Sequence, residues 1–228
     1  MLPLDIFKLI NADEYNNLKN YLNSFEKFLQ VELNNIDREQ ENLKNQNNGL
    51  LKFENDVIEE YLKQRESFIQ RKYYFETIFT SNFRNTFLGL IISALENILK
   101  DICFQYKIIK KSSFDLNDLK GNSDIEKAKT YLTKLSNKNI GKIEKWSEIN
   151  DFKFIRNKMT HQNGKIYNKS KEATTLRTIV AKYEGISFKE QNNELNIWIT
   201  SRVFCKKALD DCFDFINNLI DALKEDEL

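Results

Sequence analysis

The chain has 228 residues, of which 41% are hydrophobic, one is proline and six are glycine. The hydrophobic fraction excludes a disordered chain, and the scarcity of proline and glycine excludes an all-β sandwich or barrel, which needs many tight turns. The formal net charge of +1 indicates no class of partner. With no leader-like N-terminus and no apolar run long enough to cross a bilayer, the chain is expected to be cytoplasmic, with no membrane partner.

The first part of the chain predicts two long helices. Residues 13–46 and 50–79 carry apolar side chains mostly three or four positions apart, which is the spacing of one helix face. The Asn-Asn-Gly sequence at 47–49 predicts a short turn, so the two helices should pack antiparallel. We therefore expect residues 1–80 to form a helical extension, an antiparallel hairpin, ahead of a second domain over 81–228.

That second domain should be mainly helical. Thr-Ser-Asn at 80–82 predicts the start of a densely apolar helix that runs to about residue 110. Ser-Asp-Ile-Glu at 123–126 resembles a capping box and predicts a helix to about residue 136. Further helices are expected over 142–161, 171–183 and 201–223. Alternating residues on both sides of 191–193 predict one small β-hairpin before the last helix.

The cysteines, Cys103, Cys205 and Cys212, are odd in number and lack the short paired spacing of metal ligands. We expect them to be buried free thiols. The chain also has a single histidine, so a zinc site is excluded at the level of composition. Composition does not exclude an all-carboxylate metal site, but no Asp/Glu cluster stands out, so the sequence predicts no metal and no cofactor.

The histidine lies in the only segment that combines chemically useful side chains. On an ideal helix, Asn157 and His161 each lie about 160° from the centre of the apolar stripe, which contains Ile155. A histidine that merely fills the core should lie on that stripe. Arg156 lies at the edge of the stripe, and no acidic residue occurs between Phe152 and Lys171.

The same helix is expected to have a second apolar face. Ile143, Trp146 and Phe154 fall beside Asn157 and His161. The hairpin, the terminal helix or a second copy of the chain could cover this face. We favour a second copy, because a symmetric contact would bring two copies of the histidine together.

The string RNKMTH at 156–161, followed by Asn-Gly, resembles the Arg-x4–6-His motif of the HEPN superfamily. The resemblance covers residues 81–228. It implies a HEPN-like helical bundle, a homodimer with a composite active site, and metal-independent endonucleolytic cleavage of single-stranded RNA. It further implies a toxin or phage-defence effector, with a possible antitoxin protein or defence-system partner. Carried over by position, Arg156 and His161 are the catalytic pair, and Asn157 orients or polarises. Glu96, at the edge of the apolar arc of the preceding helix, is the candidate for a supporting glutamate, and a solvated or capping glutamate is the alternative.

The chemistry of these residue types agrees with RNA cleavage. Histidine transfers protons near neutral pH, and arginine binds phosphate oxygens as a permanently charged fork. Lys153, Lys158 and Lys165 are expected to hold the RNA backbone electrostatically. Two other hypotheses remain: a non-catalytic HEPN-like RNA-binding or protein-interaction scaffold, and a helical interaction protein in which the motif occurs by chance.

Overall fold

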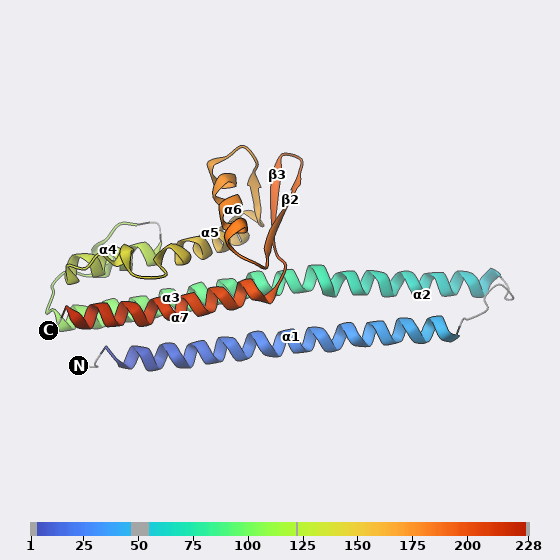
Figure 1. The fold of residues 1–228 in the computed structure, drawn as a ribbon, viewed down its shortest axis with the longest axis horizontal. Coiled ribbons are helices and arrows are strands. Elements are labelled where there is room, and N and C mark those ends of the chain that lie inside the picture. Colours follow the sequence, from blue (N-terminus) through green and yellow to red (C-terminus); the bar gives the residue numbers. More distant parts are fainter. Residues whose placement is uncertain (1–3, 47–54, 122, 227–228) are drawn as a thin grey trace. The chain divides into compact units, whose positions relative to one another are not determined.

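The structure is a computed structural model, and it describes residues 4–46, 55–121 and 123–226 (Figure 1). It is mainly α-helical with one small antiparallel sheet, which confirms the fold class expected from the sequence. The helices are α1 (Ile6–Gln46), α2 (Asn55–Tyr73), α3 (Thr80–Ile109), α4 (Asp124–Ser136), α5 (Trp146–Gln162), α6 (Lys171–Lys182) and α7 (Arg202–Glu225). The strands are β1 (Lys165–Tyr167), β2 (Ile186–Gln191) and β3 (Glu194–Ile199). Among the described residues, no helix is both long and apolar enough to span a membrane.

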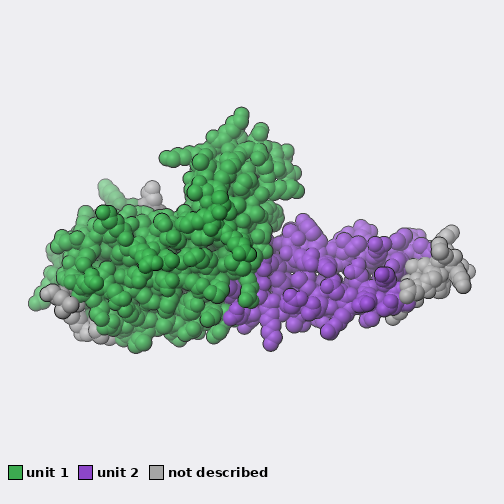
Figure 2. All heavy atoms as spheres, viewed as in Figure 1, with its two compact units in different colours: residues 1–20, 85–228 green, residues 21–84 purple. Residues whose placement is uncertain are grey.

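The chain divides into two compact units, residues 21–84 and residues 1–20 with 85–228 (Figure 2). This division differs from a boundary at residue 80, because the first turns of α1 pack on α7. Asn11 donates to the Phe213 carbonyl at 3.1 Å, and Tyr15 donates to Asp210 at 2.9 Å. The larger unit is therefore closed by the N-terminal segment as well as by the C-terminal helix.

The smaller unit is an antiparallel helix pair with a heptad seam. Leu22, Leu29 and Ile36 are seven residues apart and all buried, which is the spacing of a two-helix coiled coil. The direction of the pair follows from its ion pairs: Arg71 contacts Glu39 at 2.9 Å, Lys72 contacts Asp37 at 2.7 Å, and Arg84 contacts Glu26 at 3.0 Å. This confirms the antiparallel arrangement, while the expected Asn-Asn-Gly turn at 47–49 lies outside the described residues.

The third helix is found at Thr80–Ile109, close to the expected range, but the expected cap at its start is wrong. Helix α2 continues through a π-helical segment, Tyr74–Phe79, directly into α3. The Thr80 hydroxyl does not cap a new helix; it donates back to the Phe75 carbonyl at 2.6 Å. The chain thus remains helical through residues whose types alone suggested a boundary, although the π-helical segment interrupts the 3.6-residue period.

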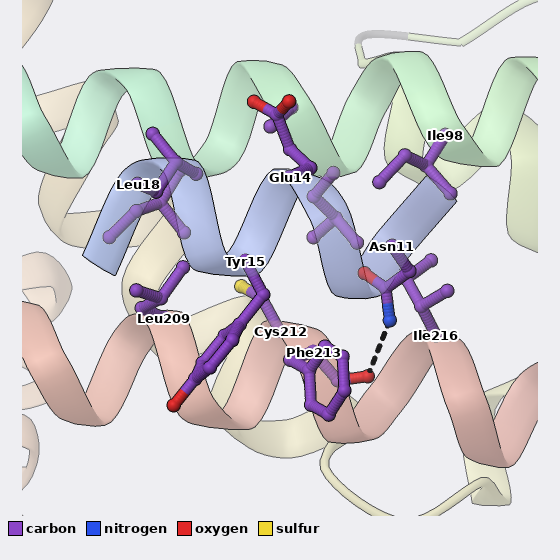
Figure 3. Close-up of a pocket in the computed structure, with 12 residues that line it drawn as sticks. Asn11, Glu14, Tyr15, Leu18, Ile98, Leu209, Cys212, Phe213 and Ile216 are labelled. Carbon is purple, nitrogen blue, oxygen red and sulfur yellow. Dashed lines mark hydrogen bonds between the residues drawn. The ribbon is translucent and has the colours of Figure 1, made fainter. Parts of the chain in front are cut away.

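Buried side chains of α3, α5 and α7 contribute to the core of the larger unit. Phe87, Ile92 and Ile102 of α3 and Phe204 and Phe215 of α7 are fully buried. The expected buried free thiols are confirmed for all three cysteines. A packing gap of about 20 Å³ lies between α1, α3 and α7, and the Asn11 amide reaches across it (Figure 3). A gap of that size holds about one water molecule and is no ligand site.

Local signals place α4 and α5. The Ser123 hydroxyl accepts the Glu126 amide, as the capping sequence predicted. Helix α5 ends at Asn163 and Gly164, both with positive φ, and the Gly164 amide donates to the Lys158 carbonyl at 3.0 Å. Gly164 has a φ of +73°, which favours glycine, and a Cβ there would also lie 3.3 Å from the Ile197 carbonyl oxygen.

The predicted β-hairpin is confirmed: β2 pairs with β3 through a turn at Asn192 and Asn193, both with positive φ. Strand β1, only three residues long, also pairs with β3 and was missed, because three residues are too few to show an alternating pattern. Strand β1 begins just after the end of α5. The Ile197 amide of β3 donates to the Gly164 carbonyl at 2.8 Å and holds this junction against the sheet. The sheet and α6 thus begin immediately after the segment that carries the histidine.

Candidate functional site

Eight residues line an open, mainly polar pocket of about 340 Å³, which we call the Arg156 pocket. Helix α3 supplies one of them, the loop before α4 and its first turn supply three, and α5 supplies the rest. These residues are Glu96, Gly121, Ser123, Asp124, Lys153, Arg156, Asn157 and His161. The structure therefore brings together the arginine, asparagine and histidine expected from the sequence, and places the expected supporting glutamate beside them.

Arg156 is held from two sides. Its guanidinium donates to the Glu96 carboxylate at 2.8 Å and to the Asn157 side-chain oxygen at 3.0 Å. The side chains of Arg156 and Glu96 are each less than one-fifth exposed, so the pair is only weakly screened by solvent. The Nε of Arg156 is buried and has no hydrogen-bond partner among the described residues. The guanidinium is thus oriented by α3 and α5 together, and these two hydrogen bonds leave other N–H donors unused.

His161 is exposed in the last turn of α5. Among the described residues, no hydrogen bond or ion pair involves its side chain. Ile149, Phe152 and Ile155 of the same helix are fully buried, so the prediction that the histidine lies off the core face is confirmed. Its imidazole is accessible from the pocket and is not committed to a structural contact.

The three lysines expected to bind RNA have different surroundings. Lys153 lines the pocket and contacts Glu126 at 2.9 Å. Lys165 is 56% exposed and lies 3.5 Å from Glu194. Lys158 is buried, is paired with Glu172, and has its ammonium 5.5 Å from the centre of the Phe154 ring. Lys158 therefore ties α5 to α6 and does not line the pocket.

The contact between Lys153 and Glu126 lowers the pKa of the Glu126 carboxyl. Burial raises the pKa of the Glu126 carboxyl, but the ammonium groups of Lys153 and Lys129 outweigh burial and hold that pKa below its usual value. Glu126 therefore stays ionised at neutral pH. It fixes the position of one cation at the pocket wall.

The prediction that Trp146 lies on an outward apolar face of α5 is wrong. This side chain is only 7% exposed, and its ring lies 5.7 Å from the ring of Phe215 on α7. The terminal helix α7, one of the covers considered for this face, therefore packs on Trp146. The preceding Lys145 has a left-handed backbone, and its ammonium lies 3.4 Å from the buried Asp211. Because α5 begins at Trp146 rather than at residue 142, Ile143 lies before the helix and the assumed helical periodicity does not apply to it.

The loop side of the pocket was not predicted from the sequence. Gly121, Ser123 and Asp124 form that wall, and Asp124 pairs with Lys100 of α3 at 2.7 Å. The capping residue Ser123 was recognised as a helix start, but its sequence pattern carries no information about a neighbouring pocket. Proximity between this loop and α5 arises only from the packing of α4.

The pocket combines a fixed guanidinium, an accessible imidazole and an amide. Such a set can bind a phosphate and move protons at its oxygens. Within the described part of the chain, no group of three or more His, Cys, Asp or Glu side chains is arranged to hold a metal ion. No family model matches the chain, and no curated protein or solved structure is significantly similar to it.

Proposed function

We propose that the protein is an endoribonuclease of HEPN type that cleaves single-stranded RNA without a metal ion. The observation that carries this proposal is the convergence of Arg156, Asn157 and His161 on one open pocket, with Glu96 orienting the arginine. The pocket adds to the motif resemblance, because half of its lining residues come from elements other than α5.

In the proposed reaction, the 2′-oxygen of a ribose attacks the adjacent phosphorus and the bond to the 5′-oxygen breaks. A base accepts the 2′-hydroxyl proton, and an acid donates a proton to the leaving 5′-oxygen. His161 fills one of these roles. Arg156 binds the non-bridging phosphate oxygens and stabilises the charge that grows on them. The products are a 2′,3′-cyclic phosphate and a 5′-hydroxyl.

The second proton-transfer group is proposed to come from a second copy of the chain. The sequence contains one histidine, whereas the reaction uses a base on one side of the phosphorus and an acid on the other. A two-fold axis near His161 would supply both from identical helices. The buried Trp146 is not part of this contact, so the proposed dimer rests on the pocket rim. A role as a toxin or phage-defence effector, with an antitoxin or defence-system partner, is part of the same proposal.

The test is cleavage of a labelled single-stranded RNA by the full chain in excess EDTA. Arg156→Ala and His161→Ala should each reduce the rate by about 10²-fold or more. Gln162→Ala, a change at the neighbouring exposed residue, is the matched control and should leave the rate unchanged. Specific activity should fall as the protein is diluted and dimers dissociate. RNA that is bound but never cleaved would favour the scaffold hypothesis, and 5′-phosphate products would contradict the mechanism.

A further inference from the structure

A second pocket adjoins the Arg156 pocket. It measures about 530 Å³ and lies between α3, the loop before α4 and α4 itself. Asp124 lines both pockets, so they meet at this residue. We call the second one the Phe104 pocket. None of its lining side chains takes part in the mechanism proposed above.

Phe104 is the unusual member of this lining. It is 65% exposed, the most exposed aromatic side chain in the described part of the chain. No contact with another ring is found for it there, although Phe114 and Tyr131, near the same pocket, stack on each other. Cys103 and Tyr131, which are almost fully buried, also line the pocket. An exposed ring therefore stands beside a pocket whose inner surface is partly apolar.

Charged and polar groups surround the ring. Lys100, Lys107 and Lys127 line the pocket together with two aspartates. Ion pairs fix two of the lysines: Lys100 with Asp124 at 2.7 Å, and Lys107 with Asp115 at 2.6 Å. Lysines beside an exposed aromatic ring are the combination with which proteins bind single-stranded nucleic acid, the lysines near phosphates and the ring under a base.

The spacing along α3 connects this ring to the reaction centre. Glu96, Lys100 and Phe104 follow one another at four-residue intervals, so they form one slanted row on the helix surface. The helix rise places Phe104 about 12 Å along the axis from Glu96. Glu96 holds Arg156, so the same row begins at the proposed phosphate site.

We propose that the Phe104 pocket binds one unpaired base of the RNA strand whose scissile phosphate lies at Arg156, with the base stacked on the Phe104 ring. This inference rests on the proposed function for the identity of the strand. It adds a subsite that selects unpaired RNA, because a base held in a duplex cannot stack on a side chain. Stacking gives little discrimination between bases, so the subsite is expected to be tolerant of sequence.

The test measures binding separately from cleavage. In a His161→Ala background, binding of a fluorescent single-stranded RNA of about eight nucleotides is followed by anisotropy. Phe104→Ala should weaken binding by about 5- to 150-fold, and Phe104→Trp should restore it. Tyr73→Ala, which removes an aromatic side chain of similar exposure from the other unit, is the control and should change nothing. Replacing one nucleotide by an abasic residue should weaken binding to the parent but have no effect on the Phe104→Ala protein.

The outcomes distinguish this proposal from the proposed function. Cleavage by the wild type with equal RNA affinity in the Phe104→Ala protein would overturn the subsite and leave the nuclease standing. Ring-dependent binding without cleavage by the wild type would support the subsite and overturn the nuclease. If Phe104→Ala instead dissociates a self-associated protein while RNA affinity is unchanged, the ring is a protein contact and the subsite is wrong.

Discussion

The Arg156 guanidinium of α5 donates a 2.8 Å hydrogen bond to the Glu96 carboxylate of α3, sixty residues away in the sequence. The arginine is thereby oriented before any phosphate arrives. In the proposed reaction this orientation lowers the cost of placing a cation against the transition state. Glu96 touches no reacting atom, so it is a positioning residue.

Replacing Glu96 should affect turnover more than substrate binding. Glu96→Ala removes the acceptor that holds Arg156, and we expect kcat to fall by up to about 10²-fold while KM changes little. Glu96→Gln keeps a side-chain oxygen at the same place and should retain most of the rate. Steady-state kinetics on both variants checks this, with thermal melts to confirm folding. Equal kcat in the wild type and the alanine variant would show that Arg156 needs no positioning by Glu96.

Lys158 lies within the motif and Lys165 follows it, but their replacement should have different effects. Lys158→Ala removes a buried stem and the ion pair to Glu172, so the free energy of unfolding should fall by about 1–3 kcal/mol. Lys165→Ala, at an exposed site, should change it by less than about 0.5 kcal/mol. Lys165→Ala should instead reduce the slope of log affinity against log salt concentration by about 1, the effect of losing one phosphate contact. Urea titrations and binding at several salt concentrations separate the two effects. A stability loss at Lys165 with none at Lys158 would reverse these assignments.

Most helices and the β-hairpin could be predicted from the sequence because their signals are local. Ser123 caps α4, Asn163 and Gly164 end α5, and Asn192 with Asn193 turns the hairpin. Each of these residues caps a helix end or adopts the positive φ of a turn, and so acts on backbone within a few positions of itself. The apolar repeat of the first helix was equally local, since its buried members recur every seven residues.

What could not be predicted depends on contacts between distant segments. Thr80 is a typical capping residue, yet its hydroxyl bonds to Phe75 within a continuous helix. Lys158 belongs to a run without acids, but Glu172 approaches it through the fold of α6. The motif residues themselves were identified because they share one helix, whereas the Asp124 wall depends on how α4 packs. The sequence therefore located the α5 side of the Arg156 pocket and, through the resemblance, Glu96 of α3, but not the wall formed by the loop before α4.

The contact between Glu126 and Lys153 predicts a dependence of stability on pH. The pKa of the Glu126 carboxyl is lower in the folded chain than its ordinary value, so its ionised form favours folding. That contribution is present above the unfolded-state pKa and is lost as the pH falls through the folded-state value. Glu126→Gln should therefore lower the melting temperature at pH 7, and the difference from the wild type should shrink below about pH 4. A difference that is constant from pH 7 to pH 3 would contradict the electrostatic origin. Lys127→Gln, which removes a charge at the next residue, is the control variant for the same melting measurements.

Replacing Trp146 tests whether the first turn of α5 packs inside the chain or against a second copy of it. Its ring packs against Phe215 and beneath the Lys129 ammonium, which lies 5.0 Å from the ring centre. Trp146→Ala should therefore lower the free energy of unfolding by about 3–5 kcal/mol, the cost of emptying a large buried site. Phe154→Ala, at a half-buried position on the same helix, should cost clearly less. Urea denaturation gives both values, and sedimentation of the same samples reports association. A Trp146→Ala chain as stable as the wild type but dissociated into single copies would restore the symmetric interface first expected from the sequence, because a surface residue loses only its contact with the partner.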